Sequence, residues 1–220
     1  MKDYQKLFLN LAIESNSLQF GSFTLKSGRK SPYFFNTANM LSNCNLFELA
    51  NCYKSAIEDK ELEFDSIYGP AYKGIFLGSI VAAAFGKDGK EYPLSFNRKE
   101  EKDHGEGGNI IGPPPSGNVL IIDDVLSAGT AGRESIEMIL KLSANPSALL
   151  VGLDRQEIGI SEMSSSKELE KDFNIKVESI VNLDSLVDFV KDNQKFDEHI
   201  EDLNKLSLIH ISEPTRHTSI

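Results

Sequence analysis

Apolar segments and amphipathic segments alternate along most of this 220-residue chain, and this order constrains the fold more than any other feature. Three short apolar segments, residues 66–68, 119–122 and 148–153, are each followed by a turn and by a stretch with helical spacing. Residues 177–181 form a fourth such segment. Strands that alternate with helices of this length predict an α/β fold with a mainly parallel central sheet flanked by helices. The helices predicted here are residues 46–58, 74–85, 132–142, 167–172 and 183–190.

The N-terminal part has a different pattern. Apolar residues at helical spacing predict a helix over residues 4–14. Residues 20–25 and 33–35 are rich in aromatic and apolar side chains, flank a basic turn, and predict two strands. We therefore expect a single domain over residues 1–205, with a small hood of one helix and two strands at about residues 1–40.

The charge balance excludes several classes of partner. Lys and Arg total 23 against 33 Asp and Glu, which gives a net charge of −10 at pH 7. Such a chain is not built to coat nucleic acid or an anionic membrane. The longest apolar run, residues 75–85, spans 11 positions, well short of the roughly 20 that a membrane-spanning helix needs. The N-terminus lacks the pattern of a signal peptide, so we predict a cytoplasmic protein.

The last residues are expected not to belong to the natural protein. Residues 206–216 resemble, word for word, the translation of a common transposon-type sequencing adapter. We therefore interpret residues 206–220 as a non-native tail that is not expected to contribute to the fold. The alternative is an ordinary C-terminal strand.

Two adjacent carboxylates, Asp123 and Asp124, follow the apolar segment 119–122. Like charges this close resist joint ionisation unless hydroxyls or a cation compensate them. Small and hydroxyl-bearing residues come next and run into a predicted helix, whose N-terminus favours an anion. A ribose 5-phosphate has both vicinal hydroxyls and a phosphate, so it would satisfy both halves. The alternative is a helix-capping turn without a ligand.

Other phosphate-binding motifs fit this sequence poorly. The chain has no Gly-x-x-x-x-Gly-Lys-Ser/Thr motif, which disfavours a P-loop nucleotidase. The glycines of residues 105–108 do not follow a predicted strand, so they do not indicate a dinucleotide site. An aspartyl-phosphate motif would need a second Asp where Val125 stands.

Residues 119–131 resemble the phosphoribosyl pyrophosphate (PRPP) signature of the type I phosphoribosyltransferases. Residues 20–36, 69–74, 96–107 and 153–157 resemble, in the same order, the bacterial orotate phosphoribosyltransferases. The resemblance implies transfer of the 5-phosphoribosyl group from PRPP to orotate, giving orotidine 5-monophosphate and pyrophosphate in pyrimidine synthesis. It also implies Mg²⁺ as a cofactor carried by PRPP, with no residue of the chain assigned as a metal ligand.

The same resemblance assigns residues to the two substrates. An aromatic pair beside a pyrimidine and an Arg beside a carboxylate are chemically suitable. The orotate site is expected to consist of Lys26, Phe34, Phe35, Ser127 and Arg155. The PRPP site is expected to consist of Lys26, Tyr72, Lys73, Arg98, Lys99, Lys102, His104, Asp123, Asp124, Val125, Leu126, Ser127, Ala128, Gly129, Thr130 and Ala131.

A basic segment within residues 98–105 resembles the mobile catalytic loop of the family. The resemblance makes Lys102 the principal catalytic cation, accompanied by Arg98, Lys99 and His104. In the family this loop reaches the neighbouring subunit's site, which implies a homodimer with shared active sites. A charged surface loop without a catalytic role is the alternative.

Two other functions remain open from the sequence. One is a transferase acting on a purine base, which Arg155 and the Phe34–Phe35 pair disfavour. The other is a PRPP-sensing regulator that binds nucleic acid, which Lys102, His104 and the absence of a basic domain disfavour.

Overall fold

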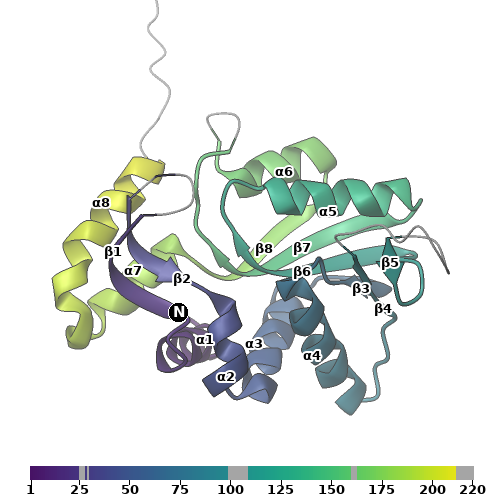
Figure 1. The fold of residues 1–220 in the computed structure, drawn as a ribbon, viewed down its shortest axis with the longest axis horizontal. Helices are drawn as coiled ribbons and strands as arrows, with labels where there is room; N and C mark the ends of the chain where they lie inside the picture. Colours follow the sequence, from purple (N-terminus) through teal and green to yellow (C-terminus); the bar gives the residue numbers. More distant parts are fainter. Residues whose placement is uncertain (25–27, 29, 99–108, 160–162, 212–220) are drawn as a thin grey trace, which may run out of the picture.

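A computed structural model of the chain describes residues 1–24, 28, 30–98, 109–159 and 163–211 (Figure 1). Most elements begin and end close to the positions that the sequence predicts. In chain order they are α1 (Asp3–Glu14), β1 (Leu18–Thr24), β2 (Lys30–Phe35), the 3-10 helix η1 (Thr37–Asn39), α2 (Met40–Asn43), α3 (Leu46–Asp59), β3 (Ser66–Tyr68), α4 (Lys73–Lys87), β4 (Leu94–Asn97), β5 (Ile110–Ile111), β6 (Asn118–Leu126), α5 (Thr130–Lys141), β7 (Asn145–Asp154), α6 (Ser165–Phe173), β8 (Lys176–Asn182), α7 (Leu183–Lys191), the 3-10 helix η2 (Gln194–His199) and α8 (Ile200–Ile211).

The central sheet has six strands in the order β5-β4-β3-β6-β7-β8. All neighbouring strands pair in parallel except β4 and β5, which are antiparallel. Figure 1 shows α5 and α6 on one face of the sheet and α3 and α4 on the other. The predicted α/β class, with a mainly parallel sheet flanked by helices, is therefore confirmed.

Strand β6 shows how the two layers of core arise. Val119 and Ile121 belong to the cluster that includes residues of α5 and α6. Leu120 and Ile122 belong to the larger cluster on the other face, with residues of α1, α3 and α4. Successive side chains of a strand point to opposite faces, so the apolar run of β6 supplies both layers.

The predicted N-terminal hood is present as a separate two-stranded sheet. Strands β1 and β2 pair antiparallel, from Leu18 opposite Phe35 to Thr24 opposite Lys30. Helix α1 packs between this hairpin and the main body, with the Phe8 ring 6.2 Å from the Phe35 ring and 6.3 Å from the Tyr53 ring. No helix within the described residues is long and apolar enough to cross a membrane.

Several predicted boundaries were wrong, and two strands of the central sheet were not predicted. Strand β6 does not end at Ile122 but continues to Leu126, because β7 pairs with it as far as Asp154. Helix α5 begins at Thr130, two residues earlier than predicted. Strands β4 and β5 were not predicted, because four and two residues are too few to show a clear apolar period.

The C-terminal segment is helical. The sequence predicted a non-native tail there, with a strand as the alternative. Helix α8 continues to Ile211, and Leu206 packs against the main core. The interpretation of residues 206–220 as a non-native tail stays a prediction.

Candidate active site

The candidate site lies where β6 and β7 end, because the largest group of sequence-predicted residues comes from these strand ends and the turns after them. Polar residues at the carboxyl ends of parallel strands typically form the ligand site of such sheets. The Arg155 N–H donates to the Leu126 carbonyl at 2.9 Å, which joins the ends of the two strands. The turn after β6 therefore lies directly beside the turn after β7.

Residues 127–129 form the turn between β6 and α5. Gly129 occupies the N-cap of α5 in the left-handed region, with φ 81°, where only glycine is free of strain. Thr130 and Ala131 then start the helix, so N–H groups of the first turn lack helical partners and favour an anion. Val125 and Leu126 are strand residues, and the Leu126 side chain is buried in the core.

Asp123 and Asp124 extend the alternation of β6 beyond its apolar part. Asp124 continues the face of β6 that carries Leu120 and Ile122, and its exposed fraction is 5%. One of its oxygens, Oδ2, accepts hydrogen bonds from Lys73 Nζ at 2.7 Å and from Thr37 Oγ1 at 2.8 Å. Asp123 lies close enough for the charges of Asp124 and Lys73 to act on it, so the two carboxyls form one pair at the end of the sheet.

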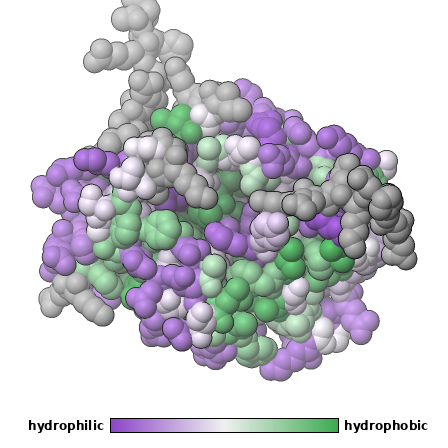
Figure 2. All heavy atoms as spheres, in the orientation of Figure 1, coloured by the Kyte–Doolittle hydropathy of each residue, from purple (hydrophilic) through white to green (hydrophobic). Residues whose placement is uncertain are grey.

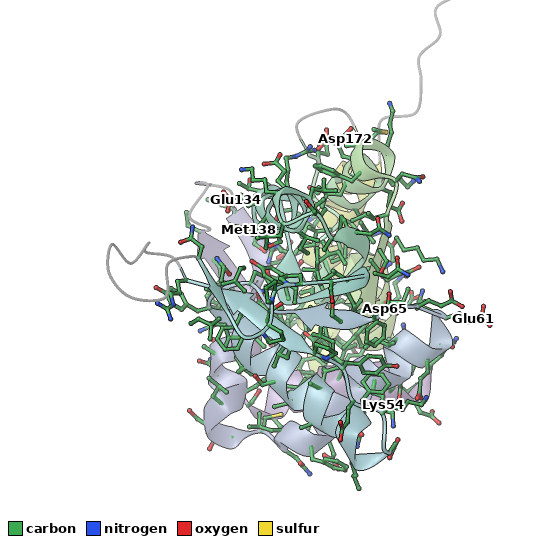
Figure 3. All side chains as sticks on the ribbon, turned by 90° about the vertical axis from the view of Figure 1, so that its right-hand side faces the viewer. Lys54, Glu61, Asp65, Glu134, Met138 and Asp172 are labelled. Carbon is green, nitrogen blue, oxygen red and sulfur yellow. The ribbon has the colours of Figure 1, made fainter. Side chains whose placement is uncertain are left out.

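Asp123 lines a cavity of about 390 Å³ on the α5 side. Figure 3 shows two other lining residues, Glu134 and Met138, near each other on α5. Arg98 and Ala131 also line the cavity. Burial, and next the charge of Asp124, raise the pKa of Asp123 to about 7. Such a shift beside a cavity is typical of a functional carboxylate.

Lys73 is positioned by a turn that only glycines can form. It is the first residue of α4, and it follows Tyr72, whose exposed fraction is 69%. A Cβ at Gly69 would lie 2.1 Å from the Gly74 carbonyl oxygen, and a Cβ at Gly74 would lie 2.7 Å from the Ile122 carbonyl oxygen. The start of α4 is therefore pressed against β6, which brings Lys73 to Asp124.

The two phenylalanines assigned to orotate point to different surroundings. Phe34 is 37% exposed and lies against Phe23, with ring centroids 5.6 Å apart. Phe35 is 8% exposed and packs on Phe8 in the core. The structure therefore leaves the Phe34 ring accessible and makes the Phe35 side chain part of the core.

Arg155 lies in a buried network rather than on an open surface. Its Nε donates to Glu157 Oε1 at 2.7 Å, its Nη2 donates to Ser31 Oγ at 3.1 Å, and its guanidinium lies 4.4 Å from the centre of the Tyr33 ring. Both Arg155 and Glu157 are less than a tenth exposed. These contacts join the end of β7 to the hood.

The basic residues predicted around pyrophosphate are only partly described. Arg98 lines the cavity beside Asp123, and Lys73 contacts Asp124. Lys26, Lys99, Lys102 and His104 lie outside the described residues. Among the residues that the structure describes, no group of three or more His, Cys, Asp or Glu side chains could hold a metal ion.

Three residues that support this site were not predicted from the sequence. Thr37 bonds Asp124, Glu157 bonds Arg155, and the Tyr53 hydroxyl donates to the Asp123 carbonyl at 3.0 Å. Glu157 follows Arg155 by two positions and was detectable as a neighbouring opposite charge. Thr37 and Tyr53 are 87 and 70 residues from their partners, and no local pattern indicates such pairs.

Comparisons with known proteins agree with this arrangement. No family model matches the chain. A Marinobacter nauticus protein named orotate phosphoribosyltransferase is 51% identical over 203 residues, which cover 92% of this chain and 96% of the relative. A Haemophilus influenzae protein of the same name is 45% identical over 204 residues, with the same coverage. The crystal structure of orotate phosphoribosyltransferase from Francisella tularensis matches with a TM-score of 0.78 and 35% identity, over 90% of this chain and 96% of that one.

The parallel sheet with a carboxylate pair and a small-residue turn after β6, together with this structural match, defines a type I phosphoribosyltransferase. The similarity extends well beyond the fold, because about half of the residues are identical over nearly the whole length of a relative. The chain belongs to the orotate phosphoribosyltransferase family.

The raised pKa of Asp123 makes the stability of the protein depend on pH. Between about pH 4 and pH 7 the folded state keeps a proton that the unfolded chain releases, so the free energy of unfolding falls as pH rises. Asp123→Asn removes the titrating carboxyl, and with it this decrease in the free energy of unfolding. We expect the free energy of unfolding of the variant, relative to wild type, to increase from about pH 4.5 to about pH 7.5. Denaturant unfolding at these two pH values, which span the window of about 4 to 7, measures this difference. A difference that stays constant over this range would contradict the buried, protonated carboxyl.

The buried pair Arg155–Glu157 gives a second expectation. Glu157→Ala removes a carboxylate that contacts the buried guanidinium, so the free energy of unfolding should fall by about 3–5 kcal/mol. The pair Arg133–Asp172 is the matched control, since its N–O distance is 2.6 Å but Asp172 is 40% exposed, at the outer surface of α6 (Figure 3). Asp172→Ala should cost less than about 1 kcal/mol in the same unfolding experiment. Equal costs for the two variants would contradict the difference in burial.

Proposed function

We propose that this protein transfers the 5-phosphoribosyl group from PRPP to orotate, producing orotidine 5-monophosphate and pyrophosphate for pyrimidine synthesis. The observation that carries the proposal is the end of β6, where Asp123 and Asp124 precede the N-terminus of α5. Carboxylates accept hydrogen bonds from ribose hydroxyls, and the N–H groups of the first helical turn favour a phosphate. One short segment thus offers partners for both ends of a ribose 5-phosphate.

The base would lie between the hood and the end of β7. Phe34 offers an accessible aromatic ring, and the resemblance assigns the orotate carboxylate to Arg155, whose guanidinium is buried beside Glu157. A purine base has no carboxylate, so it would make no use of Arg155. This residue favours a carboxylated pyrimidine over the purine alternative.

Stabilisation of the leaving pyrophosphate would carry most of the catalysis. As the bond from the ribose C1 to pyrophosphate breaks, negative charge grows on the leaving group, and the N1 atom of orotate attacks C1. Positive groups placed in advance lower the energy of that charge. Lys73, which contacts Asp124 in the structure, is proposed as one such group, and Lys99, Lys102 and His104 are expected to add to it on the basis of the family resemblance.

Mg²⁺ is proposed as the cofactor that accompanies PRPP. Asp123 and Asp124 supply carboxylate oxygens, the ligand type that Mg²⁺ prefers, so the donor set fits the ion. When bound, the ion would neutralise part of the pyrophosphate charge.

A homodimer with shared active sites and a cytoplasmic location complete the proposal. Hydrophobic residues gather over α2, α3 and α4 on the face shown in Figure 2. Leu41 in α2 and Phe47 in α3 are 52% and 47% exposed, and exposed apolar residues of this kind are typical of subunit contacts. Both cysteines, Cys44 and Cys52, are free thiols, which suits a reducing compartment.

Orotate consumption tests the activity directly. With PRPP and Mg²⁺, wild-type protein should deplete orotate in a spectrophotometric assay and form orotidine 5-monophosphate. Lys73→Ala should lower the rate roughly 10²- to 10³-fold, since a charge-stabilising group is lost. Lys87→Ala, at the other end of the same helix, is the matched control and should retain the wild-type rate. A folded wild-type protein that consumes adenine but not orotate would establish the purine alternative instead.

Mixed dimers test whether active sites are shared. Lys102→Ala and Asp124→Asn should each be inactive as homodimers, because each is proposed to serve PRPP. If the catalytic loop of one subunit completes the site of the other, mixing the two variants should restore part of the activity. Heterodimers isolated by differential tags and found inactive would contradict the shared site.

A further inference from the structure

The Thr37 side chain makes a buried contact that the known site residues do not explain. Thr37 begins η1, directly after the hood strand β2, and is fully buried. Its Oγ1 donates a hydrogen bond of 2.8 Å to Asp124 Oδ2 across 87 positions of sequence. A buried hydroxyl needs a partner, but a carbonyl in its own turn would serve. Here the partner is a carboxylate of the proposed ribose site.

Asp124 has specific requirements for such a partner. It is 5% exposed, and burying a charged carboxylate is costly unless it is paired and hydrogen-bonded. Lys73 supplies the charge at 2.7 Å, and Thr37 supplies a second donor to the same oxygen. Two donors from different elements restrict the rotation of the carboxylate. Its other oxygen, Oδ1, is thereby held in one direction.

Thr37 is itself held firmly by the hood. The Asn36 N–H donates to the Ser17 carbonyl at 2.8 Å, and Asn39 Nδ2 donates to the Asn16 carbonyl, also at 2.8 Å. The segment on both sides of Thr37 is therefore attached to the turn that precedes β1. The same strand that leads into Thr37 carries Phe34, the accessible ring of the proposed base site.

We propose that Thr37 is a positioning residue for PRPP. Through its hydrogen bond it orients the Asp124 carboxylate toward the ribose hydroxyls, and it fixes the hood strand of the base site relative to the ribose site. This inference rests on the proposed function for the identity of the ligand. Because a misoriented carboxylate would bind ribose less well, removal of the hydroxyl should weaken PRPP more than orotate.

Thr37→Val and Thr37→Ser form a matched pair for the test. Valine keeps the shape but removes the hydroxyl, whereas serine keeps the hydroxyl and removes a methyl group. Thr37→Val should raise the Kd for PRPP, measured by calorimetry, and the KM for PRPP by about 10-fold, the scale of one hydrogen bond to a charged group. The KM for orotate should change by less than about 3-fold. Thr37→Ser should bind PRPP within about 3-fold of wild type.

A double-mutant cycle separates positioning from packing. In an Asp124→Asn background the hydroxyl no longer orients a carboxylate, so Thr37→Val should then change the PRPP Kd by less than about 2-fold. If Thr37→Val lowers the melting temperature but leaves the PRPP Kd unchanged, Thr37 is only structural and the proposal is wrong. Thr37→Ala, which also removes the hydroxyl without adding volume, replaces valine if that variant does not fold.

The same experiments keep this inference distinct from the proposed activity. Wild-type protein that binds PRPP but does not consume orotate would refute the activity, while the PRPP Kd values of the variants would still decide the role of Thr37. Wild-type protein that consumes orotate, with equal PRPP Kd values for wild type and Thr37→Val, would refute the role of Thr37 alone. Wild-type protein that binds no PRPP would refute both.

Discussion

The pairing of β6 with β7 is the constraint on which the site depends. After a register shift between Val119 and Leu120, β6 stays paired to its last residue, Leu126, opposite Asp154. Regular pairing up to this point fixes Asp123 and Asp124 at the end of the strand, where their carboxyls stay close enough to interact. Gly152 makes room for this arrangement, since a Cβ there would lie 2.8 Å from the Tyr53 hydroxyl and 3.0 Å from the Asp124 carbonyl oxygen. The glycine thus lets Tyr53 reach the backbone between the two carboxylates.

Few positive charges lie close to this pair of carboxyls among the described residues. Asp124 has Lys73 on its face of the sheet, and Asp123 shares its cavity with Arg98. Lys73 acts on both carboxyls, which leaves little positive charge over for a substrate as anionic as PRPP. The chain as a whole carries −10, so long-range attraction does not make up the difference. The additional cations have to be local, and the family resemblance assigns them to Lys26, Lys99, Lys102 and His104.

The sequence predicted the elements with a clear period and missed the contacts that depend on distant segments. Residues 66–68 and 46–58 were predicted nearly to the residue, because an apolar run before a Gly-Pro turn and an amphipathic helix are local signals. The end of β6 was placed too early, because adjacent carboxylates are typical of a turn. Their tolerance inside a strand comes from Lys73 and Thr37, which the fold supplies from elsewhere. Resemblance identified Arg155, but only the structure shows the buried carboxylate beside it.

That carboxylate has a consequence for recognition of the base. Glu157 already compensates the guanidinium of Arg155, and both groups lie in a nearly dry environment. A second carboxylate, from orotate, would leave this cluster with an excess negative charge, which is unfavourable where water cannot screen it. Ser31 and the Tyr33 ring add hydrogen bonding and packing to the cluster but no positive charge. A cation beside the base would offset this charge, and the family resemblance assigns Lys26 to the orotate site.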